Sequence, residues 1–206
     1  KAGIDMYKIS TDKLAALFGK MADTKAVYMP IRKNDQVNFS KWSEGEEYCA
    51  EELKTVKSAK DLFFPQSENI VAFKRDGKKI SIETGELPSE QFVLFGVRAC
   101  DAKSFDILDK VFLAEPADQF YKARRENGIV ITTACGAPEE TCFCKIFGID
   151  AANPGGDIST WIVDGQLYWE PVTEKGKAFT KEIKDLFETA DTAAVEAQKK
   201  EISDIM

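Results

Sequence analysis

Residues 92–112 read FVLFGVRACDAKSFDILDKVF, and two hydrophobic patterns meet within them. The first six residues form a continuous apolar run, which is typical of a strand buried on both faces of a sheet. From residue 101 onward the apolar side chains recur with helical spacing over a wide arc, which predicts a helix packed against that sheet. The apolar side chains of this predicted helix are Phe105, Ile107, Leu108, Val111 and Phe112.

A second buried strand is predicted at residues 129–134, IVITTA, after a shorter helix over residues 118–127. Strand, helix and strand at this spacing indicate a βαβ unit with parallel neighbouring strands. Cys100 follows the first strand and Cys135 follows the second. Because the carboxyl ends of parallel strands meet at the ligand-binding edge of an open sheet, we expect these two cysteines to lie side by side there.

The rest of the chain adds helices and hairpins around this unit. Asp-Gly pairs at residues 76–77 and 164–165, each between alternating runs, predict two β-hairpins. The fold class predicted is α/β, a mixed sheet with a parallel βαβ core, flanking helices and β-hairpins. Further predicted elements are a helix over residues 11–21 capped by Thr11, strands over 26–31 and 36–42, a helical turn within 58–68, and helices over 173–187 and 191–206.

Composition restricts the classes of function. The net charge of −7 disfavours nucleic acid, whose phosphates need a basic patch. No apolar run approaches the roughly 20 residues of a membrane helix, and no signal peptide is recognisable at the start, so we expect a cytoplasmic protein. The chain contains no histidine, which excludes Ser-His-Asp and Cys-His catalysis and every Cys/His zinc site.

Four of the five cysteines form a constellation: Cys100, then Cys135, Cys142 and Cys144 in a C-x6-C-x-C run. A disulfide between the last two would close a strained ring. Zinc accepts four cysteines, but its usual C-x₂₋₄-C pairs are missing. An iron–sulfur cluster needs four thiolates and accepts them from separated loops. The spacing favours a cluster, while zinc and inert buried thiols remain open; Cys49 is expected to be an ordinary small residue.

Residues beside the cysteines suggest how such a site would be supported. Gly136, Ala137, Pro138 and Gly148 would let the backbone wrap closely and offer amides to sulfur. Cys100 at a helix N-terminus is expected to favour the thiolate, because the helix dipole stabilises negative charge there.

Charged and aromatic residues nearby have simpler interpretations. Arg98 and Asp101 form either a local ion pair or strand-end surface charges, or else Arg98 offsets the negative charge of a cluster. Arg124 and Arg125 are expected at the solvated surface. The tryptophans, Trp42, Trp161 and Trp169, are expected to serve as packing residues.

In order along the chain, the segments FFPQSE, FGVRACDAKSFDILDKVFL, YKARREN and CGAPEETCFCKIFG resemble the 4Fe-4S dicluster-domain family. That family includes the iron–sulfur beta subunits of cytoplasmic sulfhydrogenases and the A subunit of anaerobic sulfite reductase. The resemblance implies an electron-transfer subunit that relays electrons between a flavin-bearing NAD(P)-reductase partner and a catalytic subunit through [4Fe-4S] clusters. Cys100, Cys135, Cys142 and Cys144 match cysteines of the family's amino-terminal part.

The chain departs from the family in two ways. Ala99 stands where the family has proline, which removes loop rigidity but no ligand. Family members also continue into a ferredoxin-like module with two C-x₂-C-x₂-C-x₃-C-P runs, and the chain contains neither run. Either the chain is a fragment or it is a shortened homologue with one cluster site, and we favour the fragment. Residues 1–188 are then the α/β cysteine-cluster domain, and 189–206 are a helical connector toward the ferredoxin-like module.

The connector helix carries a narrow apolar stripe of Val195, Ile202, Ile205 and Met206. Without the module, we expect the helix to fold back on its own domain, cross to a second copy or fray.

Two other functions remain as alternatives to electron transfer. The chain could be a non-redox interaction module, with a structural Cys₄ zinc site or free thiols that only support the fold; zinc could also enter a cluster site on purification in air. A nucleotide-binding enzyme is disfavoured, because neither G-x-G-x-x-G nor G-x-x-x-x-G-K-[ST] follows a strand.

Overall fold

The computed structural model describes residues 5–206, which are built around an eight-stranded sheet ordered β10-β1-β9-β8-β7-β6-β2-β3. The four strands β2, β6, β7 and β8 run parallel, and the other neighbours pair antiparallel. This mixed sheet confirms the predicted fold class. The sheet strands are β1 (Tyr7–Ser10), β2 (Ala26–Lys33), β3 (Gln36–Lys41), β6 (Phe92–Val97), β7 (Gly128–Thr133), β8 (Ile158–Val163), β9 (Gln166–Pro171) and β10 (Glu188–Thr189).

Five α-helices and four 3₁₀ turns connect the strands in the part of the chain that is described. The α-helices are α1 (Leu14–Ala22), α2 (Ala99–Phe112), α3 (Gln119–Asn127), α4 (Glu174–Glu182) and α5 (Ala193–Ile205). The 3₁₀ turns are η1 (Thr11–Lys13), η2 (Ala59–Leu62), η3 (Cys144–Phe147) and η4 (Lys184–Leu186). Within residues 5–206, none of these helices is long and apolar enough to cross a membrane.

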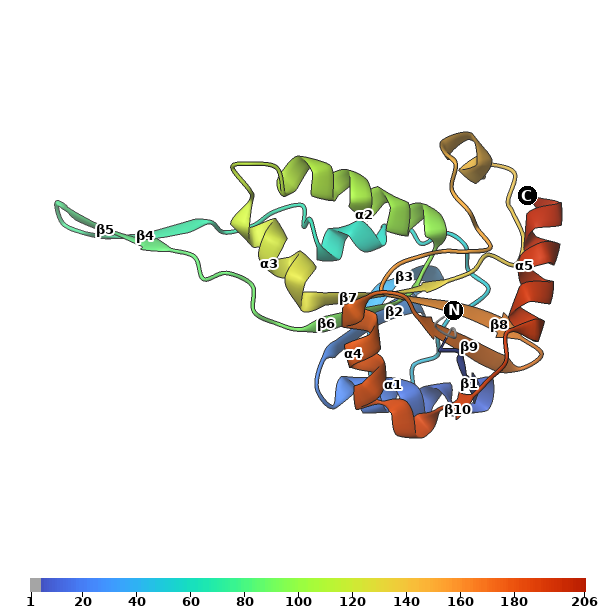
Figure 1. Cartoon of the computed structure of the whole chain (residues 1–206). Helices are drawn as coiled ribbons and strands as arrows, with labels where there is room; N and C mark the ends of the chain where they lie inside the picture. The colour runs from blue at the N-terminus through green and yellow to red at the C-terminus, as the bar shows by residue number, and fades with distance from the viewer. Residues whose placement is uncertain (1–4) are drawn as a thin grey trace.

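The predicted βαβ unit forms the centre of the sheet. β6 and β7 are parallel neighbours, and every residue in both strands is buried. Helices α2 and α3 cross over one face of the sheet, while α1 and α4 cover the other (Figure 1). Alternate side chains of β6 point to the two layers, because Phe95 packs with the core around α1 and Leu94 with the core around α2.

Several predicted boundaries and packing contacts are wrong in detail. Thr11 does not cap an α-helix; it begins the short η1 turn, and its hydroxyl donates to the carbonyl of Gly165 at 3.0 Å. The helix predicted over residues 173–187 is two elements: α4 ends at Glu182, and the separate η4 turn follows it. On α2, Ile107 and Val111 are 57% and 63% exposed, so the apolar arc of this helix is wider than the surface that the sheet covers.

The two Asp-Gly hairpins are both confirmed, but they have different environments. β8 and β9 belong to the main sheet. The other pair, β4 (Val71–Asp76) and β5 (Lys79–Thr84), forms a separate two-stranded sheet that extends away from the body (Figure 1). Every residue of β4 and β5 is exposed.

The carboxyl-terminal helix α5 folds back on the body of the protein, which is the first of the three arrangements expected for it. Val195 and Ile202 are fully buried in a cluster with Met6, Ala134 and Trp161. Trp161 and Trp169 are buried, as expected of packing residues, and their indole N–H groups donate to the Ala152 carbonyl and the Thr180 hydroxyl.

Gly96 produces an irregularity in β6 just before the first cysteine. Its φ is +82°, and the register with β7 shifts between Phe95 and Val97, as in a β-bulge. A Cβ at this position would lie 2.7 Å from the ring of Tyr48, which is closer than van der Waals contact allows. The glycine therefore provides both the backbone conformation and the space for Tyr48.

We predict that Gly96→Ala lowers the free energy of unfolding by about 3 kcal/mol, since it combines a strained φ with a clash between the new Cβ and the ring of Tyr48. Gly45→Ala is the matched control, because Gly45 has a φ of +89° with nothing within 4 Å of its Cβ position. This control should cost about 1 kcal/mol. Urea denaturation measures both, and equal losses would show that the approach of Tyr48 has no energetic consequence.

Candidate functional site

The four cysteines of the constellation are held by the ends of the two central strands and by the loop that follows β7. Cys100 lies in the first turn of α2, and Cys135 lies two residues beyond β7. Cys142 and Cys144 belong to the long loop between β7 and β8, where Cys144 begins η3. Cys49 lies apart in sequence, on the segment after β3, and its N–H donates to the Pro30 carbonyl.

The cysteines of the loop are near enough to Cys100 and Cys135 to act on them electrostatically. Negative charge at Cys144 and Cys135 raises the pKa of Cys100, and negative charge at Cys144 and Cys142 raises that of Cys135. The expected neighbourhood of Cys100 and Cys135 is therefore present, and both cysteines of the loop approach it. Among residues 5–206, however, no three Cys, Asp or Glu side chains are close enough together to hold a metal ion.

The expectation that Cys100 favours the thiolate is wrong in its net effect. Burial of the thiol is the largest cause, the carboxylate of Asp101 acts in the same direction, and the pKa rises to about 11. A backbone hydrogen bond from the helix N-terminus lowers the pKa, but by less than burial and the neighbouring charges raise it. A metal or cluster would remove this penalty, because thiols lose their protons when they ligate.

Arg98 is buried between the two strand ends. It is therefore neither a surface charge nor half of a local ion pair with Asp101, which were two of the interpretations of its sequence position. Its side chain is 6% exposed, and its guanidinium donates to the carbonyl of Ala134 at 3.0 Å and to that of Glu52 at 3.1 Å. It also donates to the carbonyl of Ala50. Arg98 thus joins the residue before Cys135 to the segment after β3.

The charge of Arg98 acts on the nearby thiol. Burial raises the pKa of Cys135, and the guanidinium of Arg98 opposes that effect. The Nε of Arg98 is also buried and has no hydrogen-bond partner among the described residues. Asp101 does not pair with Arg98; its carboxylate accepts from the Ser58 hydroxyl at 2.9 Å and lies 3.9 Å from the Lys60 ammonium.

The cysteine loop is held at few points and is largely exposed. The N–H of Glu139 donates to the sulfur of Cys142 at 3.3 Å, and this residue was not among those expected to offer an amide to a thiol. Lys54 pairs with the Glu139 carboxylate and donates to the hydroxyl of Thr141. Gly148, with a φ of +61°, ends the η3 turn in the left-handed conformation. The loop also exposes three large apolar side chains, Phe143, Ile146 and Phe147.

A groove of about 320 Å³ separates the cysteine loop from α5. It is lined on one side by Cys142 and Cys144 and on the other by Ile202 and Met206. The carboxyl-terminal helix therefore borders the cysteine site directly.

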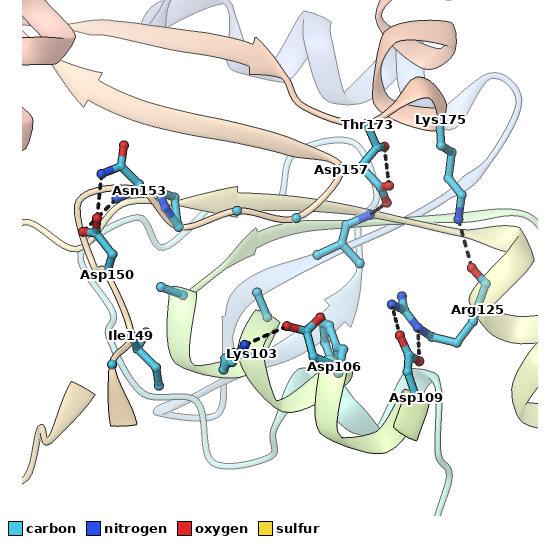
Figure 2. A pocket seen from close by; sticks show the side chains of 18 of the residues that line it. Lys103, Asp106, Asp109, Arg125, Ile149, Asp150, Asn153, Asp157, Thr173 and Lys175 are labelled. Carbon is cyan, nitrogen blue, oxygen red and sulfur yellow. Dashed lines mark hydrogen bonds and ion pairs between the residues drawn. The ribbon is translucent and has the colours of Figure 1, made fainter. Parts of the chain in front are cut away.

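A larger cleft of about 650 Å³ lies between α2 and the segment before β8 (Figure 2). Its basic groups already have acceptors: Arg125 pairs with both Asp109 oxygens at 2.8 Å, and Lys175 donates to the carbonyls of Arg125 and Gly128. Lys103 pairs with Asp106. None of these cations is free to receive a phosphate, so the cleft gives no support to a nucleotide site.

Arg124 and Arg125 are more than solvated surface residues. Arg125 combines its ion pair with a position over the ring of Phe63, 4.9 Å from the ring centroid. Arg124 pairs with Glu68. The sequence contained no periodic signal for these contacts, because their partners are 16 to 62 residues away along the chain.

Comparison with known proteins shows a similarity to a hydrogenase subunit. The chain is 31% identical over 182 residues, which are 88% of the chain, to the sulfhydrogenase 2 subunit beta of Pyrococcus furiosus. The chain is a relative of that subunit. The matched region spans about half, 52%, of the length of the Pyrococcus protein. No family model matches the chain.

We predict that Arg98→Met lowers the free energy of unfolding by at least about 3 kcal/mol, since three carbonyl oxygens would lose a charged donor. Arg32→Met is the control, because Arg32 is 56% exposed and forms a surface ion pair with the carboxylate of Glu52 at 3.2 Å. That variant should cost under about 1 kcal/mol. Chemical denaturation measures both, and similar values for the two variants would contradict the role given to Arg98.

We also predict that Cys100 in metal-free protein is alkylated with a midpoint near pH 11, well above that of an unfolded cysteine. Only the thiolate reacts, so a raised pKa means slow labelling at pH 8 to 9. Short pulses of iodoacetamide followed by peptide mass spectrometry give the midpoint. Cys135→Ser should lower it, because one neighbouring negative charge is removed; an unchanged midpoint would mean that these two thiols do not interact.

Proposed function

We propose that the chain is an electron-transfer subunit of a multisubunit cytoplasmic oxidoreductase and holds one [4Fe-4S] cluster through Cys100, Cys135, Cys142 and Cys144. It relays electrons between a flavin-bearing NAD(P)-reductase subunit and a catalytic subunit. The observation that carries the proposal is that Cys100 and Cys135 lie at the carboxyl edge of the parallel strands, with Cys142 and Cys144 of the loop close enough for their charges to act on them. The relation to a sulfhydrogenase beta subunit supports the same assignment.

The donor set fits a cluster better than other groups. It consists of thiols alone in a chain without histidine. Two of the thiols follow rigid strand ends, and two lie on an exposed loop with few internal bonds, so the loop can close around an object larger than one ion. When bound, a cluster with four thiolate ligands supplies one-electron transfer and leaves no open position for a substrate, so the chain itself performs no bond chemistry.

The remaining residues of the site position the ligands and adjust the charge. Arg98 fixes the backbone before Cys135 and supplies a buried positive charge beside the thiolates. The Glu139 amide donates to the sulfur of Cys142. Hydrogen bonds and positive charge near the sulfur atoms stabilise the reduced form of such a centre.

The exposed apolar side chains of the cysteine loop suit a contact with an electron-transfer partner. Phe143, Ile146 and Phe147 are 59%, 83% and 65% exposed, and they adjoin Cys142 and Cys144. A partner or module that covers them would lie next to the cluster and would exclude water from it. In this proposal residues 189–206 lead toward the ferredoxin-like module of the family, beside the same loop.

The alternative function is a non-redox interaction module. It is favoured by one observation, the lack of any three donors close enough for a metal ion within residues 5–206. In that case the four cysteines would be structural thiols or would bind zinc after a movement of the loop.

We predict that anaerobic reconstitution with iron and sulfide yields about four iron and four sulfide per chain, as a single [4Fe-4S] cluster requires. Serine substitution of Cys100, Cys135, Cys142 or Cys144 should each reduce the iron content strongly. Cys49→Ser is the matched control and should keep it. Iron and sulfide analysis with EPR of the reduced protein gives the result.

Zinc in protein from iron-replete anaerobic cells, or iron uptake that is insensitive to these substitutions, would reject the cluster and favour the alternative. Binding of zinc at one ion per chain that depends on the same four cysteines would identify a structural site.

A further inference from the structure

The β4–β5 hairpin projects from the body of the protein as an arm (Figure 1). Its strands pair only with each other, and all twelve strand residues are exposed. An isolated two-stranded hairpin is marginally stable in water. The arm therefore has a structural reason to be covered by another surface.

The pairing register divides the hairpin into two different faces. Phe73 pairs with Ile82, so these side chains lie on the same face as Val71 and Ile80, whose cross-strand partners on that face are Thr84 and Arg75. The four apolar side chains are 53% to 73% exposed. The opposite face carries the pairs Ala72–Glu83, Lys74–Ser81 and Asp76–Lys79. This alternation is that of a sheet with one buried face, but no part of residues 5–206 buries it.

The charge of the arm is opposite to that of the rest of the chain. Residues 71–84 contain four basic side chains, Lys74, Arg75, Lys78 and Lys79, and two acidic ones, Asp76 and Glu83. The chain has a net charge of −7, so the remainder carries −9. Three of the four basic residues flank the turn at Asp76-Gly77 closely, which concentrates positive charge at the tip.

We propose that the β4–β5 hairpin is a docking arm whose apolar face, Val71, Phe73, Ile80 and Ile82, lies on an apolar strip bordered by acidic side chains on another subunit of the complex. This proposal rests on the proposed function, since it names the surface by which the subunit would join its complex. The apolar face supplies the buried contact, and the basic tip supplies attraction to the acidic border.

The arm of a second copy is a poorer occupant. Two arms packed face to face would offer 14 residues each, whereas a stable interface uses about 20 to 30 residues a side. Their basic groups would also repel one another wherever the tips meet. A partner surface that carries acidic side chains avoids this repulsion.

The test uses the full chain co-expressed with the two partners proposed above, the flavin-bearing NAD(P)-reductase subunit and the catalytic subunit, both from the same genome. The chain carries its iron in these experiments. Phe73→Ser/Ile82→Ser removes one cross-strand pair from the apolar face. Ala72→Ser/Glu83→Ser changes the adjacent pair on the polar face and is the matched control. Assembly is measured by light scattering after size exclusion and affinity by interferometry, with circular dichroism and iron content measured on each variant.

We expect the apolar-face variant to bind at least 100-fold more weakly while its melting temperature and iron content match those of the unsubstituted protein. The control should bind normally. Lys78→Glu/Lys79→Glu should slow association and weaken its dependence on salt. Loss of iron with intact assembly would reject the cluster but not the arm.

Four results would overturn the proposal. The first two are normal affinity of the apolar-face variant for the subunits and an equal loss of affinity in the control variant. The third is a dimer of the chain alone that dissociates when Phe73→Ser/Ile82→Ser is introduced. The fourth is binding of the chain to phosphatidylserine vesicles in place of the subunits.

Discussion

The hydrogen bonds of Arg98 are the interaction on which the cysteine site depends. The residue comes directly after β6, and its guanidinium bonds the carbonyl of Ala134, directly after β7. It therefore fixes the distance between the two strand ends from which Cys100 and Cys135 project. The same group bonds carbonyls at residues 50 and 52, so the segment after β3 is tied to this edge as well. A buried guanidinium without a carboxylate partner is expensive, and here the dipoles of three carbonyl groups supply the compensating negative potential.

The sequence predicted the central fold because the two strongest local signals agree with the tertiary structure. Residues 92–97 and 129–131 are apolar, and both strands are buried throughout, including Thr132 and Thr133 at the end of β7. The Asp-Gly turns also lie where the hairpins turn. The short strands β1 and β10 were not predictable in the same way. Each has few residues, and each exists because it pairs with a distant segment, β1 with both β9 and β10. The sequence of α2 likewise did not indicate which of its apolar side chains remain exposed; these are Ile107 and Val111.

The candidate site could be predicted only as far as backbone topology determines it. Parallel strands bring Cys100 and Cys135 to one edge, and that followed from the βαβ spacing. The environment of each thiol did not follow, because burial and the charges of Asp101 and the other cysteines outweigh the helix N-terminus at Cys100. Arg98 was misjudged for a related reason. A charged residue after a strand is usually exposed, and its burial depends on carbonyls that are 36 to 48 residues away.

The β4–β5 arm and the cysteine loop lie at opposite ends of the molecule (Figure 1). The β4–β5 arm extends from the side of the body that carries α3, while the loop after β7 and the end of α5 lie at the far side. Each exposes large apolar side chains, Phe73 and Ile82 on the arm and Phe143 and Phe147 on the loop. A subunit that accepts electrons from one protein and passes them to another needs separate contact surfaces, with its redox centre close to at least one of them. The proposed cluster adjoins the loop, so the loop would transfer electrons, whereas the distant arm is free to strengthen assembly without altering the potential at the cysteines.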